Sequence, residues 1–279
     1  MADDGGVCDG CGLVVESSAE LETTHGRRLC ADCRREPQLE PAPRLPGLAT
    51  AGSRRPFRSP RTPALVAAIA FALLALANVG SILAKRGTIA FLDSLKPGDA
   101  TARVRATEVD DRQRTMLHTE TAINVLAVAV FLFWFHRTAA NVEAYGLQRR
   151  FSPGWAVASF FIPFLNLVRP LGVALETWRG SACIAGRVDV ATWRDARPSP
   201  LLVPWWIAYV VGSAWAAIAA RNLGRARSVG ELDDALHSSI EGDVLQIVAA
   251  ILCILVVREI TRLQEAGHRS PERLAETFA

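Results

Sequence analysis

Four cysteines near the N-terminus have the residue type and spacing that hold a metal ion. Cys8 and Cys11 form one C-x2-C pair, and Cys30 and Cys33 form a second pair after eighteen intervening residues. Two such pairs place four thiolates around one tetrahedral zinc ion and leave no open position for catalysis. Because so short a segment cannot build a stable core alone, the sequence predicts a small zinc ribbon in which zinc is structural.

The same four thiols allow two other interpretations. Two disulfides would suit a secreted head. A redox-active pair would need a strand–helix–strand context, which residues 12–29 do not offer. His25, between the pairs, is expected to lie at a loop tip, and the isolated Cys183 and Cys253 are expected to be buried packing residues.

A second set of polar residues stands inside or beside apolar runs. Arg137 and Asn141 follow one run at i, i+4 spacing, and Pro163, Asn166 and Arg169 lie in or just after another. A polar group at membrane depth is a functional-site hypothesis by default, so a ligand or ion site is one expectation. The structural alternative is that Asn166 caps backbone broken by Pro163 and that the arginines are anchors.

Four apolar runs set the fold class. Half of the 279 residues are apolar and 21% are charged, a composition that favours a membrane protein. A helix needs roughly 20 apolar residues to cross a bilayer. The predicted spans are residues 64–84, 121–135, 198–220 and 244–257, of which the second and fourth are short and need flanking turns to complete them.

A fifth apolar run, residues 151–168, contains Pro163, which removes a helix hydrogen bond. Broken backbone in a membrane must be buried in protein or line a wet cavity. The run is therefore predicted to be a kinked or re-entrant segment, and the re-entrant form is preferred. Residues 171–182 carry Leu171, Leu175 and Trp178 on one face, which predicts an amphipathic helix at the interface.

The expected organisation is a zinc-ribbon head over residues 1–36, a Pro/Arg-rich linker over 37–62, a helical membrane domain over 63–262 and a cytoplasmic tail over 263–279. Six prolines make the linker semi-rigid. The chain opens on polar, acidic residues, so no cleavable signal peptide is expected. Arginine beside the first span places the N-terminus in the cytoplasm by the positive-inside rule, in the inner membrane, with outer loops over 85–120 and 221–243.

A resemblance to a known family extends over about residues 64–262. The stretch from Trp134 to Ser181 is similar to the bacterial membrane family called domain of unknown function 4328. The positions that carry the resemblance are Trp134, Phe135, Arg137, Asn141, Pro153, Gly154, Trp155, Ala156, Pro163, Asn166, Leu167, Pro170, Trp178 and Ser181. The resemblance implies an integral membrane domain and no assigned activity.

The expected function is therefore that of a non-enzymatic binding, sensing or scaffold protein in the lipid bilayer. The ribbon would dock a cytoplasmic protein partner, and the small net charge of +3 gives no reason to expect nucleic acid. The alternative is passage of a small solute or ion along the broken segment. No nucleophile–base motif supports an enzyme.

Overall fold

The computed structural model describes the backbone of four short N-terminal strands and residues 56–95 and 102–269, with the side chains at 102, 103 and 105 excepted. The chain divides into two compact units, residues 1–48 and 49–279. In the first unit, β1 (Gly6–Val7) pairs antiparallel with β2 (Val14–Val15), and β3 (Glu22–Thr24) pairs antiparallel with β4 (Arg27–Leu29). Cys8, Cys11, Cys30 and Cys33 lie outside the described residues.

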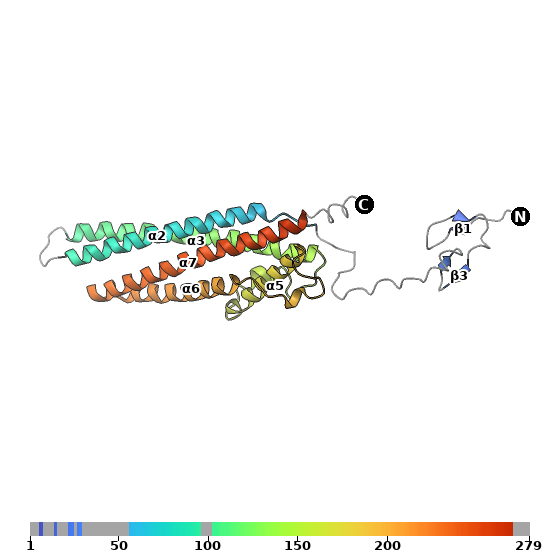
Figure 1. Cartoon of the computed structure of the whole chain (residues 1–279). Coiled ribbons are helices and arrows are strands. Elements are labelled where there is room, and N and C mark those ends of the chain that lie inside the picture. Colours follow the sequence, from blue (N-terminus) through green and yellow to red (C-terminus); the bar gives the residue numbers. More distant parts are fainter. Residues whose placement is uncertain are drawn as a thin grey trace. The chain divides into compact units, whose positions relative to one another are not determined.

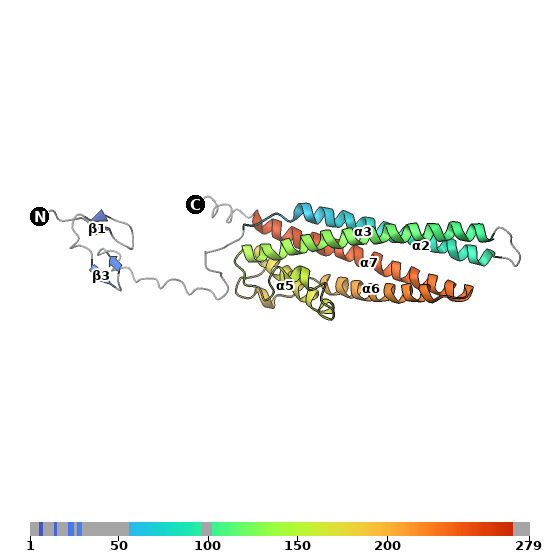
Figure 2. The ribbon, with the colours of Figure 1, turned by 180° about the vertical axis from the view of Figure 1, so that it is seen from behind.

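The second unit is helical (Figures 1 and 2). Its long helices are α2 (Arg61–Ser94), α3 (Ala102–Ala144), α6 (Leu202–Arg225) and α7 (Val229–His268). All four are long and apolar enough to cross a membrane, counting residues 106–144 of α3. The four predicted spans are therefore confirmed as apolar helices, and together they indicate a multi-pass membrane protein.

The helices extend well past the predicted spans. At a rise of 1.5 Å per residue, the 34 residues of α2 reach about 50 Å, whereas the hydrocarbon core is about 30 Å thick. Most of the described part of residues 85–120 is helix, although the sequence suggested an outer loop. Charged residues end an apolar run without ending a helix, because Lys, Arg and Glu are good helix formers.

α7 is central to the packing, because it lies against both α2 and α6, while α3 lies against α2. The connection from α6 to α7 is short. The Ser228 hydroxyl accepts from Glu231 N, and the Glu231 carboxylate accepts from Arg227 N, which fixes the start of α7.

The fifth apolar run forms no continuous helix. It contains only the short helix α4 (Trp155–Ala158) and the 3-10 turn η2 (Leu165–Leu167), with Phe164 at a positive φ of 64°. The prediction of a broken segment around Pro163 is confirmed to this extent. The Trp206 indole donates to the Leu167 carbonyl at 2.9 Å, and thus satisfies part of the interrupted backbone.

The predicted amphipathic helix is confirmed as α5 (Arg169–Ile184). A second 3-10 turn, η3 (Trp193–Asp195), follows it. In both views α5 lies at the end of the unit where α2 begins and α7 finishes. At the opposite end α2 finishes, α3 begins and α6 connects to α7 (Figures 1 and 2). We call these the strap end and the hairpin end. The strap is Pro56–Pro60, the short segment preceding α2.

Candidate functional site

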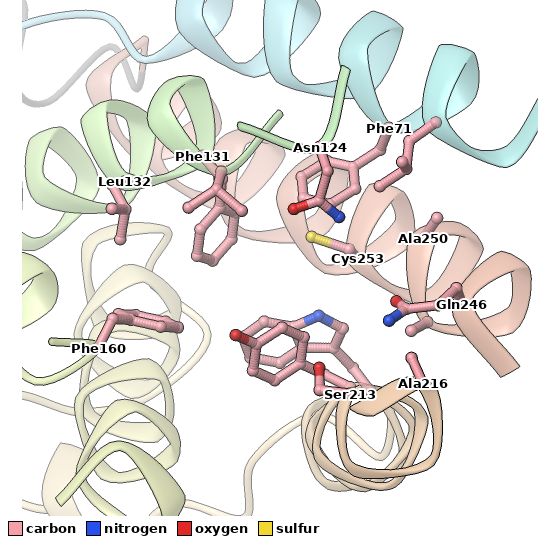
Figure 3. Close-up of a pocket in the computed structure, with 15 residues that line it drawn as sticks. Phe71, Asn124, Phe131, Leu132, Phe160, Ser213, Ala216, Gln246, Ala250 and Cys253 are labelled. Atoms are coloured by element: carbon pink, nitrogen blue, oxygen red, sulfur yellow. The ribbon is translucent and has the colours of Figure 1, made fainter. Parts of the chain in front are cut away.

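A cavity of about 260 Å³ lies among α2, α3, α6 and α7 (Figure 3). Its wall is mostly apolar, and Phe160 from the broken segment closes one side. The lining residues are Phe71, Leu74, Asn124, Val128, Phe131, Leu132, Phe160, Trp205, Tyr209, Ser213, Ala216, Gln246, Ala249, Ala250 and Cys253. Because all the contributing spans are apolar, this cavity lies within the part of the helices suited to lipid. We call it the bundle cavity.

The bundle cavity has both aromatic and polar groups in its wall. Phe131 and Phe160 face it from one side, while the Asn124 and Gln246 amides and the Ser213 hydroxyl face it from the other, where Phe71 lies beside Asn124 (Figure 3). Phe131 and Phe160 pack edge to face, with ring centroids 6.0 Å apart. An aromatic wall with a few polar groups is the ordinary form of a small-molecule site, in which the polar groups set the orientation of an apolar ligand.

A buried ion pair lies at the hairpin end. Lys85 Nζ of α2 is 2.6 Å from Asp243 Oδ2 of α7, and the two residues are each 8% exposed. Glu120 of α3 adds a second carboxylate that interacts with both of them. Its Oε1 atom is buried and has no hydrogen-bond partner among the described residues. When all three groups are ionised, this cluster carries one excess negative charge.

The ion pair and the bundle cavity are continuous along two helices. Glu120 is four residues before the cavity residue Asn124 on α3, and Asp243 is three residues before the cavity residue Gln246 on α7. Residues at these spacings share one helix face. Polar side chains therefore follow one another from the cavity toward the hairpin end.

The predicted polar residues Arg137 and Asn141 hold the strap. The Asn141 side chain accepts from Arg58 N at 3.1 Å and donates to Arg58 O at 2.9 Å, while Arg137 donates to Ser59 O at 3.1 Å. Phe57 stacks on His268 at 4.1 Å. The strap therefore joins the ends of α3 and α7, and this last part of the predicted linker is a bound segment.

A buried amide network supports the strap. Gln264 of α7 is fully buried, and its amide donates to Thr138 O and to Ser181 Oγ. Its carbonyl accepts from Asn141 at 2.9 Å. The amide of Gln264 thus uses both its donor and its acceptor side, and it connects α3, α5 and α7.

Pro163, Asn166 and Arg169 lie apart from this network in the broken segment and at the start of α5. Arg169 is held over the rings of Phe151 and Trp155, at 4.8 and 5.2 Å. Asn166 is partly exposed, and its backbone N–H bonds to Ile162 O. The described contacts therefore bring Arg137 and Asn141 together and do not join them to the other three residues.

Arg149 is a structural residue that sequence reasoning missed. It lies in the connection after α3, where it donates to Ala139 O at 2.8 Å and to Thr177 Oγ1 at 3.1 Å. Burial lowers the pKa of Arg149, and the nearby Glu176 carboxylate, 3.4 Å away, partly restores it. Its role is to fasten this connection to α5.

The four cysteines of the predicted zinc site lie outside the described residues. Within the part of the chain that the structure describes, no three His, Cys, Asp or Glu side chains gather in a way that could hold a metal. Cys183 and Cys253 are both buried, as expected.

Four apolar helices, a broken segment and an amphipathic helix define a helical, multi-pass membrane domain with a cavity between its spans. The chain belongs to the family described as domain of unknown function 4328, whose model matches residues 98–262. This confirms the family resemblance over α3 to α7. Searches of curated proteins and of solved structures found no match.

Proposed function

We propose that this protein is a non-enzymatic membrane receptor or scaffold whose bundle cavity takes up a small, largely apolar molecule from the bilayer. The observation that carries the proposal is the cavity itself, which places aromatic rings and the polar groups of Asn124, Ser213 and Gln246 at the depth of the apolar spans. A volume of about 260 Å³ lies just below the roughly 300–1,000 Å³ of ordinary small-molecule pockets, so it suits only a small molecule or the end of a lipid chain.

The bundle cavity contacts the elements that would transmit the effect of a bound molecule to the strap. Phe131 lies on α3 and Phe160 in the broken segment, so an occupant would press on both. α3 continues from Phe131 to Arg137 and Asn141, which hold the strap. A change in cavity occupancy would thereby reach the segment that leads to the N-terminal head.

Saturable quenching of tryptophan fluorescence by a brominated ten-carbon alcohol tests the proposal in detergent. Trp205 lines the cavity, so bromine bound there quenches its emission by contact. Ala250→Phe fills the cavity and should abolish the saturable component. Ala72→Phe adds the same ring at an exposed position on α2 and should preserve it. Equal quenching in both variants would exclude the cavity as the binding site.

The head is part of the proposal as a structural zinc ribbon that docks a cytoplasmic protein. Its support is that Cys8 and Cys11 fall between β1 and β2 in the sequence, and that Cys30 directly follows β4. We expect one zinc per chain in metal analysis of the purified full-length protein, and none after Cys8→Ser/Cys30→Ser. Full zinc content in that variant would remove the ribbon from the account.

The proposed location is the inner membrane with the strap end in the cytoplasm, supported by the arginines of the linker. A cysteine introduced at Ser94, at the end of α2, should react with an impermeant maleimide added outside the cell. One introduced at Ser59 should not. The reverse labelling pattern would invert this orientation.

Passage of an ion remains a second candidate, and the Lys85–Asp243 pair with Glu120 favours it. Ionisable groups between spans often mark ion or proton routes. Proton flux into liposomes that contain the protein, followed with an internal pH dye, should then fall at least tenfold in Asp243→Asn. Flux equal to that of empty liposomes in the unmodified protein would reject passage.

A further inference from the structure

A second hollow, of about 440 Å³, lies between the strap and α3, and we call it the strap pocket. The strap contributes Pro56 and Arg58, and α3 contributes Phe133, His136, Arg137, Ala140 and Asn141. Two segments that are far apart in the sequence thus form its walls. The Asn141 contacts with the Arg58 backbone fix the distance between these walls.

Basic residues line both walls of the strap pocket, and no carboxylate lines either wall. Arg58 lies on the wall formed by the strap, and Arg137 and His136 lie on the wall formed by α3. The nearby Glu265 is occupied by Arg61, at 2.7 Å, and by the Ser59 hydroxyl. Two guanidinium groups around one hollow repel each other, and an anion between them would remove that repulsion. Guanidinium groups favour phosphate because they can bind two of its oxygens at once.

The position of the strap pocket identifies the source of the phosphate. Phe133 lines the pocket and is 57% exposed on the apolar part of α3, and Arg137 Cζ lies 5.3 Å from its ring. Within one turn of α3, the surface therefore changes from apolar at Phe133 to cationic at Arg137. This is the order of groups along a phospholipid, in which acyl chains give way to a charged headgroup.

We propose that the strap pocket binds the headgroup phosphate of an anionic phospholipid. Arg58 and Arg137 hold the phosphate from opposite walls, and Phe133 lies against the acyl chain. A bound lipid bridges the strap and α3, so the membrane itself fastens the segment that leads to the head. This site is separate from the bundle cavity and does not depend on the function proposed for it.

Lipid binding to the purified full-length protein in a neutral detergent tests the proposal, with fluorescent phosphatidylglycerol as the probe. Arg58→Gln and Arg137→Gln should each weaken binding roughly fivefold, since a basic residue near anionic lipid contributes about 1 kcal/mol. Arg137→Lys should keep more affinity than Arg137→Gln. Arg197→Gln changes an exposed arginine outside the pocket and is the matched control.

Several outcomes would overturn the proposal. The first is an equal loss of affinity in the Arg197→Gln control, and the second is an equal affinity for phosphatidylcholine. The third is displacement of the probe by inorganic phosphate at the same concentration as unlabelled phosphatidylglycerol, which would identify free phosphate as the ligand. Thermal unfolding of each variant checks the fold. Arg58→Gln keeps the test valid if Arg137→Gln is unstable, because the strap contacts Asn141 through the Arg58 backbone.

Discussion

The amide network of the strap end and the ion pair of the hairpin end bury polar groups in different ways. At the strap end, the Gln264 and Asn141 side chains satisfy one another and the backbone of the strap. At the hairpin end, Lys85 is paired with Asp243, but Glu120 adds a buried oxygen that has no hydrogen-bond partner among the described residues. A satisfied network fixes one conformation, whereas an unbalanced charge can bind a proton or an ion. The strap end is therefore the one held in a fixed conformation, and the hairpin end is the one that can respond to a proton or an ion.

Breaking the ion pair should produce the largest effect. Asp243→Ala leaves Lys85 without its hydrogen-bonded counter-ion in a site where it is only 8% exposed, which should cost about 3 kcal/mol. Unfolding in mixed micelles with a rising fraction of SDS measures this loss. The triple variant Lys85→Met/Asp243→Leu/Glu120→Gln removes all three charges and should recover most of it. An equal loss in the triple variant would mean that packing, and not charge, stabilises the hairpin end.

Removing the amide at the centre of the strap end should have the next largest effect. Gln264→Ala leaves Thr138 O, Ser181 Oγ and Asn141 without their shared partner, at a cost of roughly 2 kcal/mol. Gln148→Ala removes an exposed amide near the end of α3 and should change the free energy of unfolding little. Should the two variants be equally stable, the satisfied network would not be what anchors this end.

Releasing the strap should have a smaller effect. Asn141→Ala removes both hydrogen bonds to the Arg58 backbone and one bond to Gln264, so the strap should open more often and trypsin should cleave after Arg58 roughly fivefold faster. The cleavage rate after Arg187, in the exposed connection that follows α5, is the internal reference. An unchanged ratio of the two rates would show that other contacts hold the strap.

Neutralising Glu120 should have the smallest effect and the opposite sign. Glu120→Gln removes a carboxylate that lies near Asp243, so the protein should become more stable by roughly 0.5 kcal/mol at pH 8. The same SDS titration measures this gain. A loss close to that of Asp243→Ala would instead assign Glu120 as a principal partner of Lys85 and would make the two ends alike.

Several elements could be predicted from local sequence. Residues 64–84 contain no charge, so a helix that crosses the bilayer was expected. Pro163 likewise predicted that residues 151–168 would form no continuous helix. The alternation of Leu171, Leu175 and Trp178 with charged residues gave α5 to within two residues at each end. These features depend on neighbours in the chain, which is why the sequence reveals them.

The site residues depended on distant partners. Lys85 and Asp243 are 158 residues apart and each simply ends an apolar run, so nothing local indicates that they meet. For Asn141 the sequence left a ligand site and a structural role open. Its partner is the backbone of Arg58, in a linker whose prolines did not indicate this contact. Part of the backbone break near Pro163 is satisfied by Trp206, 39 residues beyond Leu167, whereas the sequence pointed to Asn166 as the capping residue.

Native mass spectrometry of the protein extracted in mild detergent tests the central claim, a bilayer-facing receptor cavity, most directly. The account predicts a bound apolar molecule of constant mass on the unmodified protein and on Ala72→Phe, and its loss in Ala250→Phe, where the added ring fills the bundle cavity. An unmodified protein that carries no such molecule, or an Ala250→Phe variant that retains it, would contradict the account.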